Sequence, residues 1–182
     1  MKKIAFVAAA AALLSTPAMA APSDTESFDI NASIPETCTM EGINDINLGE
    51  ISINTTAGSN ALLINTLLDT ETAGDFWLSC NENNRMSFSQ TNGVLKNQDR
   101  SVAPGDDAGF KDTINYVVNA VNYRNGLLQP GCVSGLGCST ATRGAVHRQI
   151  DMRASVSAIG QGGLRPLAGN YQDTVTVTVT TL

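Results

Sequence analysis

The closing segment 168–182 constrains the fold of this chain more than any other stretch. A turn leads into strict alternation of valine and threonine, with Val175, Val177 and Val179 at every second position. This period of two predicts a β-strand whose valine face lies on a core and whose threonine face points away from it. Such a strand pairs with earlier strands or offers its edge to another chain, and nothing in the segment protects that edge.

The opposite end of the sequence is typical of a secretory signal peptide, residues 1–20. Lys2 and Lys3 form a charged start, residues 4–14 form the apolar middle, and small residues at the cleavage site precede Ala21. We therefore expect an exported mature chain that begins at Ala21. The apolar stretch is too short for a good membrane span, and no later segment approaches the required length.

Composition indicates an acidic all-β domain. Without the first 20 of its 182 residues, the chain keeps 162 residues, with nine Lys and Arg against seventeen Asp and Glu, a formal charge of −8. This balance argues against a nucleic-acid partner. The length suits one domain with a sizeable core, and runs of helix-forming residues are scarce, whereas Thr, Asn, Ser, Gly and Val are abundant.

Four cysteines in an exported protein predict two disulfides, for which three pairings are possible. Cys132 and Cys138 flank a glycine-rich loop that is able to close on itself. Cys38 and Cys80 would then join two early strands. No Cys-x-x-Cys motif is present and the sequence has a single histidine, so we predict neither a metal site nor a cofactor.

Alternation and turn residues predict further strands along the chain. We expect them at 46–53 with a bend at Gly49, at 61–68, at 75–80, at 86–89 pairing back onto the preceding strand, at 114–123 and at 149–158. Residues 96–112 lack a core pattern and predict a long surface loop. Short strands separated by Gly, Asn and Pro turns predict an antiparallel sandwich.

An earlier alternating segment, from Phe28 to Ile34, has two interpretations. Phe28, Ile30, Ala32 and Ile34 share one face, and Pro35 ends the pattern. The segment is either the first strand of the domain or a strand donated to a neighbouring subunit.

Motifs that carry catalysis are absent. His147 has no nucleophile or acid placed near it by a known pattern, and the nucleophile-elbow, zinc-protease and phosphate-loop motifs do not occur. We therefore expect a structural protein rather than an enzyme.

Several segments together resemble the spore coat protein U and Csu-type pilin family, subunits of archaic chaperone–usher pili in Gram-negative bacteria. Besides the signal peptide, the resemblance rests on Phe28 to Cys38, Asn47-Leu48-Gly49, Trp77-Leu78-Ser79-Cys80, Ile114-Asn115-Tyr116 and the closing segment Ala168 to Val179. It spans nearly the whole mature chain. The chain departs from the family at Leu182, where members commonly end in an aromatic residue.

The resemblance implies an incomplete immunoglobulin-like antiparallel sandwich that lacks its final strand. A signal peptide (1–20) and a donor segment (21–34) would precede the pilin domain (35–182). The acceptor groove would lie along Val175, Val177, Val179 and Leu182. A periplasmic chaperone would fill it with its own strand, and an outer-membrane usher would exchange that strand for Phe28, Ile30, Ala32 and Ile34 of the next subunit. The product would be a homopolymeric pilus on the cell surface, supporting adhesion or biofilm formation.

The main alternative is a self-complete secreted sandwich. It would bind a carbohydrate or another surface ligand, as a tip adhesin or a coat protein, through Trp77, Tyr116 or Tyr123.

Overall fold

The computed structural model describes residues 24–65, 68–70, 74–126, 128–156 and 161–182. The expected signal peptide, residues 1–20, lies outside the described residues. The chain divides into two units, Met1–Ile34 and Pro35–Leu182.

Residues 24–34 of the first unit have no regular secondary structure. Phe28, Ile30 and Ile34 are each more than four-fifths exposed. The strand predicted over 28–34 is therefore not formed, because a β-strand needs a neighbouring strand to bond its backbone groups. The apolar alternation of segment 28–34 therefore has no strand to pair with in the described part of this unit.

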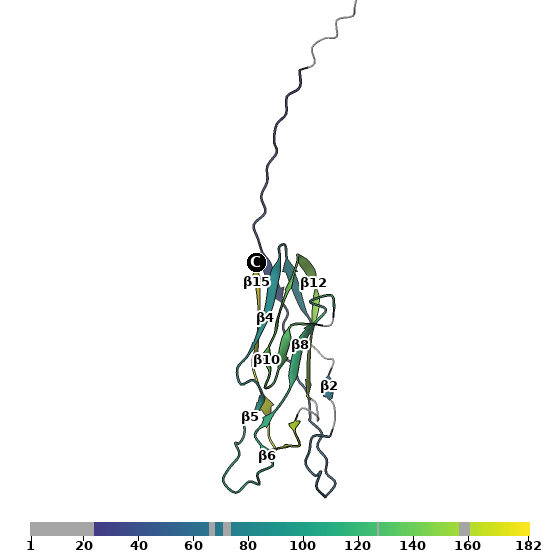
Figure 1. The fold of residues 1–182 in the computed structure, drawn as a ribbon, viewed down its shortest axis with the longest axis vertical. Coiled ribbons are helices and arrows are strands. Elements are labelled where there is room, and N and C mark those ends of the chain that lie inside the picture. Colours follow the sequence, from purple (N-terminus) through teal and green to yellow (C-terminus); the bar gives the residue numbers. More distant parts are fainter. Residues whose placement is uncertain (1–23, 66–67, 71–73, 127, 157–160) are drawn as a thin grey trace, which may run out of the picture. The chain divides into compact units, whose positions relative to one another are not determined.

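The second unit is built on two antiparallel sheets (Figure 1). The larger has the order β1-β3-β12-β8-β9-β10, with β2 also beside β12. Its strands are β1 (Cys38–Glu41), β2 (Leu68–Thr70), β3 (Phe76–Cys80), β8 (Val117–Val121), β9 (Gly131–Val133), β10 (Gly137–Cys138) and β12 (Val146–Val156). The smaller has the order β11-β4-β15, formed by β11 (Thr140–Arg143), β4 (Asn84–Gln90) and β15 (Val175–Thr181).

Short strands complete the domain. β14 (Tyr171–Gln172), β5 (Leu95–Asn97) and β7 (Thr113–Ile114) form a third antiparallel sheet, and β6 (Phe110–Lys111) pairs with β13 (Arg165–Pro166) in parallel. The described residues contain no α-helix. The prediction of an all-β, immunoglobulin-like sandwich is confirmed. None of the described residues forms a helix with the length and apolarity that a membrane span needs.

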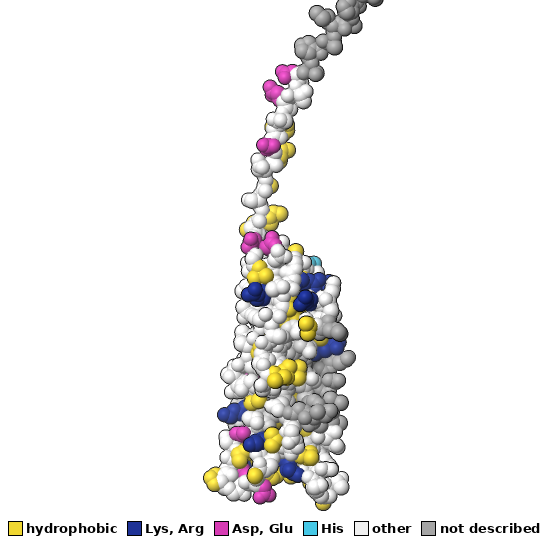
Figure 2. Space-filling model, in the orientation of Figure 1, with side chains coloured by type: hydrophobic (Ala, Val, Ile, Leu, Met, Phe, Trp, Pro, Cys, Tyr) yellow, Lys and Arg dark blue, Asp and Glu magenta, His cyan; other side chains and the backbone are white. Residues whose placement is uncertain are grey.

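The core lies between the two main sheets. β3 and β12 alternate as predicted, with Phe76, Leu78, Cys80 and then Ile150, Met152, Ala154 and Val156 buried. Met86 and Phe88 of β4 join the same cluster. On the face of the domain in Figure 2, hydrophobic side chains are scattered rather than gathered in one patch, as is usual for protein surfaces. Ala158, expected inward as well, lies outside the described residues.

Both expected disulfides are present. Cys38 and Cys80 are directly opposite each other on β1 and β3 and are bonded. Cys132 and Cys138 close the β9–β10 hairpin in the same way. Because disulfides persist in oxidising compartments, the two bonds indicate an extracytoplasmic environment.

The prediction that residues 86–89 pair back onto the preceding strand is wrong. β4 lies in the smaller sheet, between β11 and β15. Buried Asn84, at its start, donates through Nδ2 to the carbonyl of Gly144 at 2.9 Å and accepts through Oδ1 from the Tyr123 hydroxyl at 2.7 Å. These long-range bonds join the start of β4 to residues 60 and 39 positions away, so its surroundings are not set by the local turn alone.

The strands predicted at 46–53 and 61–68 are also not continuous. Within their described residues they contribute one antiparallel bridge, Ile53 to Ile64, and Leu68 begins β2. Gly49 and Leu62 have φ of 68° and 63°, so the backbone leaves the extended conformation at both places.

The strand predicted at 114–123 is broken into β7 and β8. At the break, the Asn115 amide donates to Gln161 Oε1 and the Tyr116 amide donates to Ser134 Oγ, each at 2.9 Å. Side chains from distant segments thus take the place of the backbone hydrogen bonds between strands at this point. The loop predicted at 96–112 likewise has short strands at both ends, β5 and β6.

Candidate functional site: an uncovered seam between two sheet edges

β15 forms one edge of the smaller sheet. It pairs with β4 over its whole length, and no described strand pairs with its other side. Val175, Val177 and Val179 pack against the core but remain half-buried, and the alternate threonines face outward. The closing strand predicted from the sequence is therefore confirmed, and its edge is free within the described part of the domain.

β1 forms the edge of the larger sheet and lies beside β15. Met40 of β1 is directly opposite Leu78 of β3, so both side chains point to the interior. Leu78 is 0% exposed, whereas Met40 is 38% exposed. Inward-facing residues of both edge strands are thus only partly covered, and no described strand of the domain closes the seam between β1 and β15.

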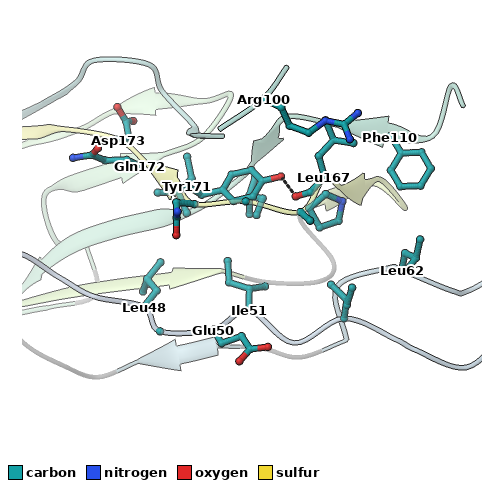
Figure 3. A pocket seen from close by; sticks show the side chains of 18 of the residues that line it. Leu48, Glu50, Ile51, Leu62, Arg100, Phe110, Leu167, Tyr171, Gln172 and Asp173 are labelled. Carbon is teal, nitrogen blue, oxygen red and sulfur yellow. Dashed lines mark hydrogen bonds between the residues drawn. The ribbon is translucent and has the colours of Figure 1, made fainter. Parts of the chain in front are cut away.

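Beside the end of this seam is a groove of about 900 Å³. One wall is formed by segment 46–53, and the other by segment 166–173, which leads into β15. Figure 3 shows Leu48, Ile51 and Leu62 across the cavity from Leu167 and Tyr171. The lining combines these apolar side chains with polar ones, among them Glu50, Arg100 and Asp173.

The conformation of segment 46–53 follows from its sequence. Alternation changes phase at Gly49, as predicted, and the Gly49 amide donates to Asn47 Oδ1 at 2.8 Å in a tight turn. The turn keeps Ile46, Leu48, Ile51 and Ile53 packed on the core on both sides of the bend. The change of phase at Gly49 therefore places four apolar side chains in the wall that segment 46–53 forms.

Hydrogen bonds fix the opposite wall. The Tyr171 hydroxyl donates to the Leu167 carbonyl at 2.6 Å, and the Tyr116 hydroxyl donates to Asp173 Oδ2 at 2.9 Å. Asp173 Oδ1 accepts from the backbone amides of Asn92 and Thr174 at 2.9 and 2.8 Å. Burial, and then the bond to Asp173, raise the pKa of Tyr116; burial raises that of Tyr171. Both phenols therefore stay protonated and hold the start of β15 in place.

The rim of the groove carries one ion pair, between Arg100 and Asp106 at 2.7 Å. A backbone bond from Ala103 and the Arg100 guanidinium lower the pKa of Asp106. The pair is solvent-accessible, so it contributes little stability. Among the described residues, no group of three His, Cys, Asp or Glu is placed to hold a metal ion.

The other residues singled out from the sequence are widely separated. Leu182 is half-exposed at the end of the described chain, where its amide donates to the Asn83 carbonyl. Tyr116 and Tyr123 are buried, so their assignment as ligand contacts is wrong; their hydroxyls serve internal hydrogen bonds. Trp77 is exposed, as predicted, because it lies on the face of β3 that points away from the core.

Sequence reasoning missed the wall opposite segment 46–53. Leu95, Phe110 and Leu167 line the groove but lie in short, irregular segments without periodicity. The phase change at Gly49 marks the wall formed by segment 46–53 in the sequence. No comparable pattern marks the opposite wall.

No protein-family model, curated protein or solved structure matches this chain.

Proposed function

We propose that this protein is a structural subunit of a surface pilus of the archaic chaperone–usher type, joined to its neighbours by donor-strand exchange. The observation that carries the proposal is the partly covered core between the edges of β1 and β15, on whose outer sides no described strand pairs. A strand inserted there would bond to the β15 backbone and cover the half-buried valines and Met40.

The donated strand is segment 28–34 of another copy of the chain. It has seven residues, equal to the length of β15, so paired strands of about 23 Å would match end to end. Its Phe28, Ile30 and Ile34 side chains are exposed and alternate on one face together with Ala32. Insertion would bury this face against the apolar lining of the seam.

The exposed strand edge implies two partners, a chaperone and an usher. A free, regular strand edge beside exposed core residues invites aggregation, so a periplasmic chaperone would cover the seam with its own strand during export. An outer-membrane usher would then exchange that strand for the segment of the next subunit. Adhesion or biofilm formation is the role proposed for the resulting fibre.

The mature protein purified from the periplasm tests this assembly, with and without residues 21–34. We expect the full chain to occur bound to a chaperone or as heat-resistant polymers. The truncated chain should still bind the chaperone but fail to polymerise. Stable free monomers of both forms would refute the proposal, because the fold would then be complete without a donated strand.

A further inference from the structure

A second surface lies on the outer face of the larger sheet, pointing away from the core. Two rows of side chains cross β1, β3 and β12 there. One row is Thr39, Ser79 and His147, and the next is Glu41, Trp77 and Gln149, as the strand registers require. Trp77 is therefore the single large apolar side chain of these two rows, with polar side chains on either side.

The aromatic side chain at the centre of this surface is accessible. Trp77 is 51% exposed, although an indole ring is normally buried when its strand packs on another layer. Its ring centroid lies 5.2 Å from that of His147, with the planes tilted by 33°. Two rings thus border one shallow corner of the sheet.

Polar groups around Trp77 are held in place. Ser79 Oγ and His147 Nδ1 are 2.8 Å apart, so Nε2 is the imidazole nitrogen that remains for a ligand. Gln149 Nε2 donates to Asp75 Oδ2 at 3.0 Å, which orients the amide beside the indole. These bonds reduce the conformational entropy that a ligand would otherwise have to remove.

A hollow of about 540 Å³ adjoins the His147 ring. Thr37, Thr39, Ser79, Asn81 and His147 line it together with Cys80, Ala145 and Val146, and most of its accessible surface is apolar. Hydroxyl groups both donate and accept hydrogen bonds. The hollow therefore offers apolar contact as well as a few hydroxyl partners to a ligand.

We propose that this surface, comprising Trp77, His147, Gln149 and the adjoining hollow, binds a neutral pyranoside. The axial C–H groups of a sugar ring would stack on the electron-rich face of Trp77. Its hydroxyls would bond to His147, Gln149 and the hydroxyl groups of Thr37 and Thr39, and its C–H groups would contact the apolar side of the hollow. Glu41 and Asp75 nearby disfavour anionic sugars, since like charges repel. One exposed indole is too small an apolar area for a stable protein interface.

The site is independent of the proposed pilus assembly, because it uses the outer face of β1, β3 and β12 rather than the seam beside β15. Loss of sugar binding would leave polymerisation unchanged, and loss of polymerisation would leave the indole in place. The two proposals therefore fail separately.

The single tryptophan of the sequence provides a direct readout. The mature protein is titrated with methyl glucoside, methyl galactoside and methyl mannoside, and with the trisaccharides maltotriose and mannotriose, at millimolar concentrations. We expect at least one of them to shift and saturate the Trp77 emission. His147→Ala, which keeps the reporter, should weaken the affinity several-fold.

Trp77→Ala is examined by saturation-transfer NMR, with Leu128→Ala as the matched control because Leu128 is also exposed but lies between β8 and β9. We expect Trp77→Ala to weaken binding by about tenfold or more, since the ring supplies most of the buried apolar area. The control should bind as the unaltered protein does. Absence of saturable binding for every probe, or binding that survives in Trp77→Ala, would overturn the proposal.

Discussion

Replacing Phe28 and Ile30 with alanine should separate subunit joining from domain stability. Both side chains are exposed in the single chain, at 84% and 86%, and belong to the unit that precedes the domain. Complete burial of one such side chain is worth about 1.5–3 kcal/mol, so the pair loses about 3–6 kcal/mol. This is an upper range, and it corresponds to binding that is about 10²- to 10⁴-fold weaker.

The domain should not respond to the same change. Side chains that pack on nothing contribute less than about 0.5 kcal/mol to the free energy of unfolding. The midpoint of thermal unfolding should therefore be equal for the altered and unaltered chains when each is measured as its one-to-one complex with the chaperone.

A fluorescent peptide of residues 24–36 measures the joining step. It is titrated with the chaperone complex of the mature chain in which Phe28 and Ile30 are replaced by serine, so that this receptor keeps the seam, cannot donate its own segment, and exchanges the chaperone strand for the peptide. Anisotropy then gives Kd for the natural peptide, for the peptide with both alanines, and for a control with Asn31→Ala, which changes the opposite face. Equal Kd values for all three, or equal loss of joining and of domain stability, would refute strand donation.

Three further predictions concern the domain itself. Cys38→Ser should lower its stability by about 4 kcal/mol and Cys132→Ser by about 2 kcal/mol, because the bonds close separations of 42 and 6 residues; denaturant titration of each variant tests this order. Burial raises the pKa of Tyr116, so the folded state holds this proton more tightly, and stability should be complete below about pH 10 and decline above it. Tyr116→Phe should reduce that alkaline decline, and an unchanged pH profile would contradict the assignment. Gly131→Ala should destabilise by about 1–3 kcal/mol, since the added carbon collides with the backbone of β8, whereas Gly144→Ala has room and should be nearly neutral in thermal unfolding.

Strand faces were predictable wherever alternation was strict. Val175, Val177 and Val179 pack on the core, and Phe76, Leu78 and Cys80 are buried, as their positions indicate. Side-chain direction in a strand is set locally by the pleat, so it is readable from spacing alone.

Pairing was less predictable because it depends on distant residues. The polar turn before Met86 looks the same whether the next strand returns to its own sheet or crosses to the other one. The crossing goes with contacts between distant residues: the buried Asn84–Tyr123 bond spans 39 positions of sequence, and β4 pairs with β11 and β15. Similarly, the interruption at Asn115 depends on Gln161, which no local pattern connects with it.

The sequence by itself therefore determined the strand faces, the two disulfides and the apolar alternation of segment 28–34. Only the tertiary structure decided that β1 and β15 are edges that lie beside each other, that Met40 stays partly exposed between them, and that segments 46–53 and 166–173 enclose a groove. The reason is physical: periodicity specifies which face of a strand is buried, whereas the neighbours of an edge are specified by packing among residues far apart in the chain.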